Sequence, residues 1–429
     1  MTVTHAATSL VAPQNSAVAL TYTTYLPLLF NCYPRQAADP AYQYDMNIIN
    51  AAAAWGRCNL YAGNVTIAII DTGVDLDHSE LQANLLTGYD FVDNDAVPED
   101  GQGHGTNVAG IAAAALNGTG VAGVAPTAKI LPVRVLDNAG NGYESDIAAG
   151  ITYAADHAQV LNLSLGGVNS SATMQNAINY AVSTRGRLVI AAAGNCGGSN
   201  FSANGCQFQN QTFYPAAYSN VMAVAATTST DEHASFSNAG SYVDVAAPGV
   251  GIYNTYPNNA YAAFSGTSQA TPHVSGLAAL VWAQNPGYAA AQVWSRITST
   301  AVDLGPAGVD AAFGAGRIDV RQALGLTALR ADPRAAHPTE AAQGTVIDQR
   351  TAAIAPGRIV VKFKDTLNAA SVSRVLAALP QAEVSQSIQA IEAQVLRVPV
   401  GTEWTTIDRL RARPEVEYAE PDYVLHLIR

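Results

Sequence analysis

Val65-Thr66-Ile67-Ala68-Ile69-Ile70-Asp71-Thr72-Gly73 is the stretch on which the predicted fold depends. Its first six residues are β-branched or small and uncharged, which is typical of a strand that is buried on both faces of a sheet. A carboxylate, Asp71, follows directly in a turn that contains glycine. Because parallel sheets bind ligands beyond the carboxyl ends of their strands, we expect Asp71 to lie at a ligand-binding edge.

Strands and helices alternate along the chain on both sides of this stretch. We predict further strands at 129–136, 159–165, 187–193 and 221–227, and helices at 108–116, 143–157, 171–184 and after Ser268. This βαβ order predicts an α/β fold, in which helices cover both faces of a doubly wound parallel sheet.

Composition limits the class of protein. The chain has 429 residues, of which 49% are hydrophobic, enough for a large core and a smaller second domain. Only 13% are charged and the formal net charge is −12, so no basic stripe exists for nucleic acid or an anionic membrane surface. The longest apolar runs are far shorter than the roughly 18 residues of a membrane span. We expect a monomer without nucleic-acid or membrane partners.

Changes in composition divide the chain into four parts. Residues 1–45 are polar and weakly periodic and predict an irregular arm, and residues 46–325 hold the α/β domain. Residues 326–355 contain prolines among Ala, Arg and Thr and predict a linker. Residues 356–429 predict a small α+β domain, with strands at 358–363, 393–398 and 416–419 and helices at 370–379 and 405–413.

The four cysteines form two groups. Cys196 and Cys206 share one polar loop, and Cys32 and Cys58 both precede the first strong strand. We favour two local disulfides and an extracellular location over free thiols or a metal site, because no Cys-x-x-Cys spacing with nearby histidines indicates zinc. Residues 1–34 contain no Lys or Arg, so a secretory signal peptide is not evident.

Asp71, His104 and Ser268 each lie in a glycine-rich turn at the end of a predicted element. Nucleophilic acyl transfer needs a hydroxyl, an imidazole that takes its proton and a carboxylate that holds the imidazole. Taken singly, the three residues have structural explanations as a turn former and helix caps. Taken together they favour catalysis, whereas His273, which an apolar helix follows, is interpreted as structural.

The stretches around these residues resemble the three signatures of subtilisin-like serine proteases: Ile69–Val74, Gly103–Gly110 and Gly266–Val274. The order Asp, His, Ser along the chain is also that of the family. The resemblance implies that Ser268 is the nucleophile, His104 the general base and then acid, and Asp71 the group that orients His104. It also implies that Asn195 donates a hydrogen bond to the oxyanion.

The same resemblance implies polypeptide substrates and a cleft with two strand edges. The substrate-binding residues that it implies are Ser164, Leu165 and Gly166 on one edge, Gly140 and Gly142 on the other, and Ala193, Gly194 and Phe213 around the primary specificity pocket. Phe213 stands where many relatives carry a small residue, so we expect a shallow pocket.

The resemblance requires no cofactor, but structural calcium is considered. Glu80 stands where a ligand Asp is usual in the family, and Asn117 lies in a loop that looks shorter than that of strong binders. These two residues are the candidate calcium ligands, and both departures weigh against the site.

Residues 356–429 resemble the family's propeptide, a ferredoxin-like α+β domain, through Val360–Phe363 and Tyr418–Tyr423. In the family this domain precedes the protease, whereas here it follows it. We therefore predict that the tail lies in the cleft as an intramolecular inhibitor, with Leu425 and Ile428 or Arg429 in subsites. A domain that only assists folding is the alternative.

The sequence thus favours a secreted serine endopeptidase that is restrained or folded by its own C-terminal domain. A catalytically silent peptide-binding protein of the same fold is the alternative, and the intact set of Asp71, His104 and Ser268 argues against it. A lipase or esterase is disfavoured, because these enzymes carry Gly-x-Ser-x-Gly after a strand and the order Ser, Asp, His.

Overall fold

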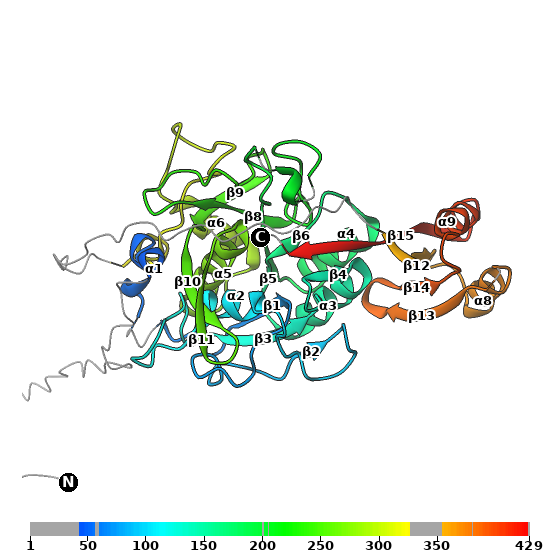
Figure 1. Ribbon diagram of the computed structural model, residues 1–429, viewed down its shortest axis with the longest axis horizontal. Helices are drawn as coiled ribbons and strands as arrows, with labels where there is room; N and C mark the ends of the chain where they lie inside the picture. Colours follow the sequence, from blue (N-terminus) through cyan, green and yellow to red (C-terminus); the bar gives the residue numbers. More distant parts are fainter. Residues whose placement is uncertain are drawn as a thin grey trace, which may run out of the picture.

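The computed structural model of the chain describes residues 43–55, 60–199, 201–204, 206–326, 354–379 and 381–427. Most of the predicted arm and linker therefore lies outside the described residues, as does Cys32. A large α/β domain and a smaller domain lie side by side, and one strand, β15, reaches from the smaller into the larger (Figure 1).

A parallel sheet of seven strands forms the centre of the large domain. Its strand order is β2–β3–β1–β5–β7–β8–β9, which confirms the predicted doubly wound α/β fold. The carboxyl end of β1 is Asp71, as expected from the apolar run before it. The strands span β1 (Thr66–Asp71), β2 (Tyr89–Asp90), β3 (Lys129–Arg134), β5 (Val160–Leu163), β7 (Leu188–Ala192), β8 (Val221–Thr227) and β9 (Val243–Pro248).

Helices cover both faces of this sheet because β1 is apolar on both. Ile67 and Ile69 belong to the core cluster under α2 (His104–Ala113) and α5 (Thr267–Gln284). Ala68 and Ile70 belong to the opposite cluster, under α3 (Glu144–His157) and α4 (Ala172–Asn179). The starts of α2 and α5 place His104 and Ser268 at helix N-termini, as predicted. None of the helices within the described ranges is long and apolar enough to cross a membrane.

The remaining elements of the large domain pack around this core. They include α1 (Tyr44–Ile48), α6 (Ala290–Ser299), α7 (Val320–Ala323) and the antiparallel pair β10 (Ile252–Tyr256) and β11 (Ala260–Phe264). The expected boundary at residue 45 falls inside α1. His273 Nε2 lies 3.0 Å from Asp45 Oδ2 and Nδ1 lies 2.8 Å from Gln269 O, and the side chains of both Asp45 and His273 are fully buried. His273 thus ties α1 to α5, in keeping with its structural interpretation.

The second domain is an antiparallel sheet with two helices. Its strands are ordered β13–β14–β12–β15, and α8 and α9 pack on the cluster that contains Ile359, Leu396 and Ile407. The bounds are β12 (Ile354–Phe363), α8 (Ala369–Ala377), β13 (Glu383–Ile388), β14 (Ala393–Arg397), α9 (Glu403–Arg411) and β15 (Val416–Leu427).

Two strands of this domain differ from the prediction. The sequence did not predict β13, because its residues are mostly polar and exposed at a sheet edge. It ended the last strand at residue 419, whereas β15 continues to Leu427. The added residues pair with the large domain, a long-range interaction that leaves no local pattern in the sequence.

Candidate active site

Asp71 and His104 meet at the carboxyl edge of the sheet. His104 Nδ1 lies 2.8 Å from Asp71 Oδ1, and both side chains are buried. Because Nδ1 faces a carboxylate, it carries the ring proton, and the lone pair is on Nε2. Nε2 is buried and makes no hydrogen bond with any described residue. The pair therefore has the tautomer that a general base requires.

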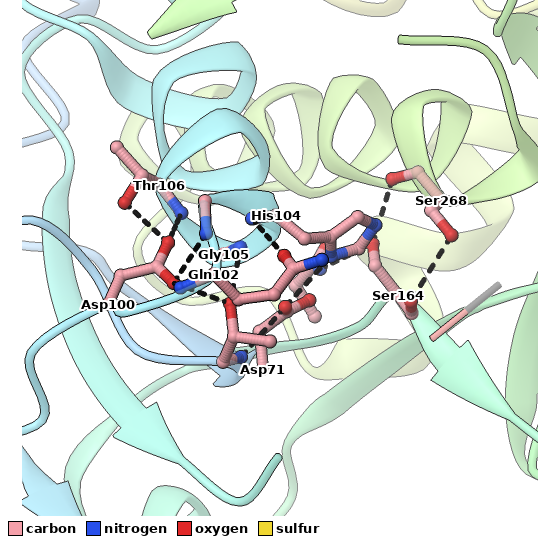
Figure 2. Close-up of polar contacts among 11 residues, drawn as sticks. Asp71, Asp100, Gln102, His104, Gly105, Thr106, Ser164 and Ser268 are labelled. Carbon is pink, nitrogen blue, oxygen red and sulfur yellow. Dashed lines mark hydrogen bonds and ion pairs between the residues drawn. The ribbon is translucent and has the colours of Figure 1, made fainter. Parts of the chain in front are cut away.

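Ser268 is the second residue of α5, at the positive end of the helix dipole. Its Oγ donates to the carbonyl oxygen of Ser164 at 3.2 Å, and Ser164 Oγ donates to the carbonyl oxygen of Ser268 at 2.8 Å. Figure 2 shows the His104 ring between Asp71 and Ser268. The fold thus brings together the three residues that the sequence singled out.

Asn195 lies next to α5 with its amide group oriented. Its Oδ1 accepts hydrogen bonds from Thr267 N at 3.0 Å and from Thr267 Oγ1 at 2.9 Å. With Oδ1 held by two donors, Nδ2 is presented on the other side of the amide. The preceding Gly194 has φ +106°, and a Cβ there would lie 2.8 Å from Phe213 Cγ, so the turn requires glycine.

A strand from the second domain occupies the space between two strands of the first (Figure 1). β15 pairs antiparallel with β4 (Asn141–Tyr143) on one side and with β6 (Leu165–Gly166) on the other. Leu427 N donates to Gly140 O at 2.9 Å, and Leu427 is paired with Leu165, next to Ser164. β15 therefore runs along both predicted substrate edges towards the nucleophile.

Two leucines of β15 pack against these edges. Leu425 is 6% exposed and belongs to the core cluster that includes Leu165. Leu427 covers Gly140, where an added Cβ would lie 2.7 Å from Leu427 Cδ1. Leu425 was predicted to fill a subsite, whereas Ile428 and Arg429 lie outside the described residues.

Two acidic residues of β15 cap helices of the large domain, and the sequence analysis gave them no role. Glu420 accepts hydrogen bonds from Ala172 N and Thr173 N at the start of α4, at 3.1 and 2.8 Å. Asp422 accepts from Ser145 N and Ser145 Oγ at the start of α3, at 3.0 and 2.7 Å. Carboxylates stabilise the positive ends of helices, so both contacts attach β15 to the large domain.

The same interface buries two further carboxyl groups with one cation. Arg358 donates to Asp422 Oδ2 at 2.7 Å and lies over the Tyr143 ring. Burial raises the pKa of Glu144 well above its ordinary value, and the nearby Glu420 raises it further. Burial also raises the pKa of Asp146 to about 6, although Arg358 opposes this shift. The interface thus favours protonated carboxyl groups.

Phe213 fills the space between two glycine-lined segments. An added Cβ would lie 2.6 Å from Phe213 Cε1 at Gly166, and a Cβ at Gly194 would also contact this ring. Phe213 is 4% exposed. Among the predicted substrate-binding residues, Gly166, Gly194 and Phe213 therefore lie together next to Asn195.

A disulfide lies in the same buried cluster as Phe213. Cys196 and Cys206 are bonded, which confirms one of the two predicted disulfides, and both pack against Phe213. Cys196 follows Asn195 in the chain, so the bond closes the loop that carries the amide. Cys58 and Cys32 both lie outside the described residues.

The candidate calcium ligands are neighbours, but hydrogen-bond donors surround the carboxylate. Glu80 accepts from Asn117 Nδ2 at 2.9 Å, Tyr261 OH at 2.8 Å and Thr119 Oγ1 at 3.2 Å. Asn117 Oδ1 is turned away and accepts from Thr119. Calcium binds oxygen acceptors, so this donor set does not fit the ion. The described residues contain no cluster of three or more acidic, His or Cys side chains arranged for a metal.

Comparison with known proteins identifies relatives of both domains. The family model described as "Subtilase family" matches residues 62–316, and "Fervidolysin N-terminal prodomain" matches residues 340–422. Thermitase of Thermoactinomyces vulgaris is 47% identical over 284 residues, 66% of this chain and 95% of thermitase.

Two further relatives show similar identity over the same part of the chain. The thermophilic serine proteinase of Bacillus sp. (strain AK1) is 50% identical over 60% of this chain and 62% of its own length. Subtilisin DY of Bacillus licheniformis is 42% identical over 61% of this chain and 90% of its own length.

Proposed function

Because the chain belongs to the subtilase family and is a subtilisin-like serine endopeptidase, we propose that Asp71, His104 and Ser268 form its catalytic triad. The 2.8 Å contact between His104 Nδ1 and Asp71 Oδ1 supports this assignment, together with the position of the ring beside Ser268 (Figure 2). Polypeptides are the substrates.

In this mechanism Ser268 Oγ attacks the scissile carbonyl carbon while His104 Nε2 takes the hydroxyl proton. Asp71 stabilises the imidazolium that forms. Asn195 Nδ2 and the Ser268 N–H donate hydrogen bonds to the oxyanion of the tetrahedral intermediate. His104 then protonates the leaving amine, and water repeats the sequence on the acyl-enzyme.

We further propose that the C-terminal domain restrains the enzyme by occupying its cleft. The single observation that carries this proposal is β15 lying between β4 and β6, the two edges to which an extended substrate would bind by β-augmentation. Two buried helix caps, from Glu420 and Asp422, attach the same strand to the large domain. The Cys196–Cys206 disulfide supports an extracellular location for the enzyme.

Covalent labelling tests the proposed nucleophile. A peptidyl phosphonate reacts only with a serine that a neighbouring base activates, so the chain without residues 424–429 is expected to be labelled at Ser268. Mass spectrometry of the labelled peptide gives the site, and Ser268→Ala is the matched unreactive control. If the shortened, folded chain takes no label, the peptide-binding alternative holds instead.

The docking of the C-terminal domain is expected to weaken as pH rises. Burial raises the pKa values of Glu144 and Asp146, and the nearby Asp422 of the C-terminal domain raises both further. Glu420 also raises the pKa of Glu144, whereas Arg358 lowers that of Asp146. We therefore expect the docked form to bind protons more tightly than the undocked form. Docking is therefore strongest below the ordinary carboxyl pKa and weakens as pH rises through about 6 and above. For each proton that is released on undocking, the equilibrium constant for docking falls by at most about 10-fold per pH unit.

The rate of phosphonate labelling reports how often the cleft is open. Because the pH dependence of His104 also affects this rate, it is compared between the wild-type chain and Glu144→Gln, which removes one titratable group from the interface. The ratio of the wild-type rate to the variant rate is expected to increase from pH 5 to pH 8. A ratio that does not change with pH would contradict the prediction.

A further inference from the structure

Asp100 is a buried carboxylate with no role in the mechanism above. It lies in the loop before α2, is 5% exposed, and accepts five hydrogen bonds. Its Oδ1 accepts from Thr72 Oγ1, Gln102 N and Gly103 N at 2.9, 2.9 and 2.7 Å. Its Oδ2 accepts from Thr106 N and Thr106 Oγ1 at 2.9 and 2.6 Å. One side chain therefore joins the end of β1 to the first turn of α2 (Figure 2).

These hydrogen bonds connect the chain segments that contain Asp71 and His104. Thr72 N donates to Asp71 Oδ1 at 2.8 Å, while the Thr72 hydroxyl donates to Asp100 and accepts from Gly105 N at 2.9 Å. Gly105 follows His104 in the chain. Asp71 and His104 are thus each adjacent to a residue of the Asp100 network.

The two backbones are also in direct contact, so the network has little room to shift. An added Cβ at Gly105 would lie 2.1 Å from Gly73 O and 3.1 Å from Asp71 Cβ. Gln102 Oε1 accepts from His104 N at 2.8 Å, which fixes the first residue of α2 from the loop side. A change at Asp100 should therefore move His104 relative to Asp71.

The charge of Asp100 also bears on the reaction. His104 begins α2, where the positive end of the helix dipole opposes formation of an imidazolium. Asp100 binds N–H groups at that same helix end and supplies a compensating negative charge. The other charged groups around this loop are Asp71, Glu99 and Asp75. Glu99 is exposed and lies near Asp75.

We propose that Asp100 is a positioning residue of the reaction, which rests on the triad assigned above. Its carboxylate fixes His104 against Asp71 through Thr72 and the first turn of α2. Its charge also stabilises the imidazolium that forms when Ser268 loses its proton. Asp100 touches neither substrate nor reacting atoms, so its effect is on turnover and not on substrate binding.

The test replaces Asp100 by Asn, which keeps the shape but removes the charge and one acceptor. It is made in the chain without residues 424–429, so that the cleft is accessible. We expect kcat to fall roughly 10- to 100-fold with KM nearly unchanged, since small misplacements of catalytic groups have effects of this size. The acid limb of the kcat/KM profile should move to lower pH by about 0.5 unit.

Glu99→Gln is the matched control, because it removes the same charge one residue away without touching the network. It is expected to leave kcat within about twofold of the parent and to shift the acid limb less. Thr72→Val keeps the charge of Asp100 and removes the hydroxyl that donates to Asp100 and accepts from Gly105 N. Thr72→Val should lower kcat without moving the acid limb of the kcat/KM profile. It tests the proposal independently if Asp100→Asn does not fold.

Changes of less than twofold in kcat for both Asp100→Asn and Thr72→Val would overturn the proposal. That outcome differs from failure of the triad itself, because the parent chain would still be labelled at Ser268 by the phosphonate. Absence of label in the parent would overturn the triad, and with it this inference.

Discussion

Deleting residues 424–429 is expected to raise the rate of peptide hydrolysis by roughly 100-fold. The deletion removes the main-chain pairing with β4 and β6, in which each hydrogen bond contributes about 1 kcal/mol. It also removes Leu425, whose burial contributes about 2 kcal/mol. After the cost of ordering the strand, the remaining few kcal/mol keep the cleft closed for most of the time.

The second domain should remain folded in this variant. β15 pairs with β12 through residues such as Pro421 and Ala419, which the deletion leaves in place. Initial rates on a peptide p-nitroanilide measure the effect. Trp404→Ala, at a half-exposed position of α9, is the control and should not change the rate. An unchanged rate in the shortened chain would mean that the domain assists folding without closing the cleft.

Replacing Phe213 by Gly is expected to change the side chain preferred before the scissile bond. The ring lies between Gly166 and Gly194. Under the assignment of these residues to the primary specificity pocket, it leaves room only for a small substrate side chain. Removing it opens a pocket for a large apolar side chain. The ratio of kcat/KM for Phe over Ala substrates should rise roughly 10- to 100-fold, the effect of burying one aromatic side chain.

Two p-nitroanilides that differ only in this residue measure the ratio, in the chain without residues 424–429. The ratio is informative even though Phe213→Gly removes a buried ring and destabilises the fold by a few kcal/mol. Phe208→Gly is the control, because Phe208 is 57% exposed near the same disulfide. If the ratio stays the same in an active Phe213→Gly enzyme, Phe213 does not limit the pocket.

The positions of Asp71, His104 and Ser268 could be predicted from sequence because local patterns determine where these residues lie. Asp71 ends an apolar run, and His104 and Ser268 begin helices whose small residues are visible in the sequence. Each position is set within a few residues of the motif itself. The parallel sheet followed from the same patterns, because a strand buried on both faces is continuously apolar.

The contacts between the domains could not be predicted in this way. Glu420 binds α4 across 247 residues and Asp422 binds α3 across 277, so no local periodicity reports either contact. Asp100 was missed for another reason. An acidic residue before a glycine-rich turn is common in loops, and only the fold shows that its five donors come from both sides of the site.

The continuity of β15 has a consequence for how the enzyme would respond to dilution. The strand pairs with β12 in the second domain and with β4 in the large domain, so the proposed inhibitor and the enzyme are parts of one molecule. The closed fraction then depends on the effective concentration of a tethered segment, not on the total protein concentration. Dilution, which frees an enzyme from a separate inhibitor chain, would leave this one as closed as before. Lasting release would require breaking the tether.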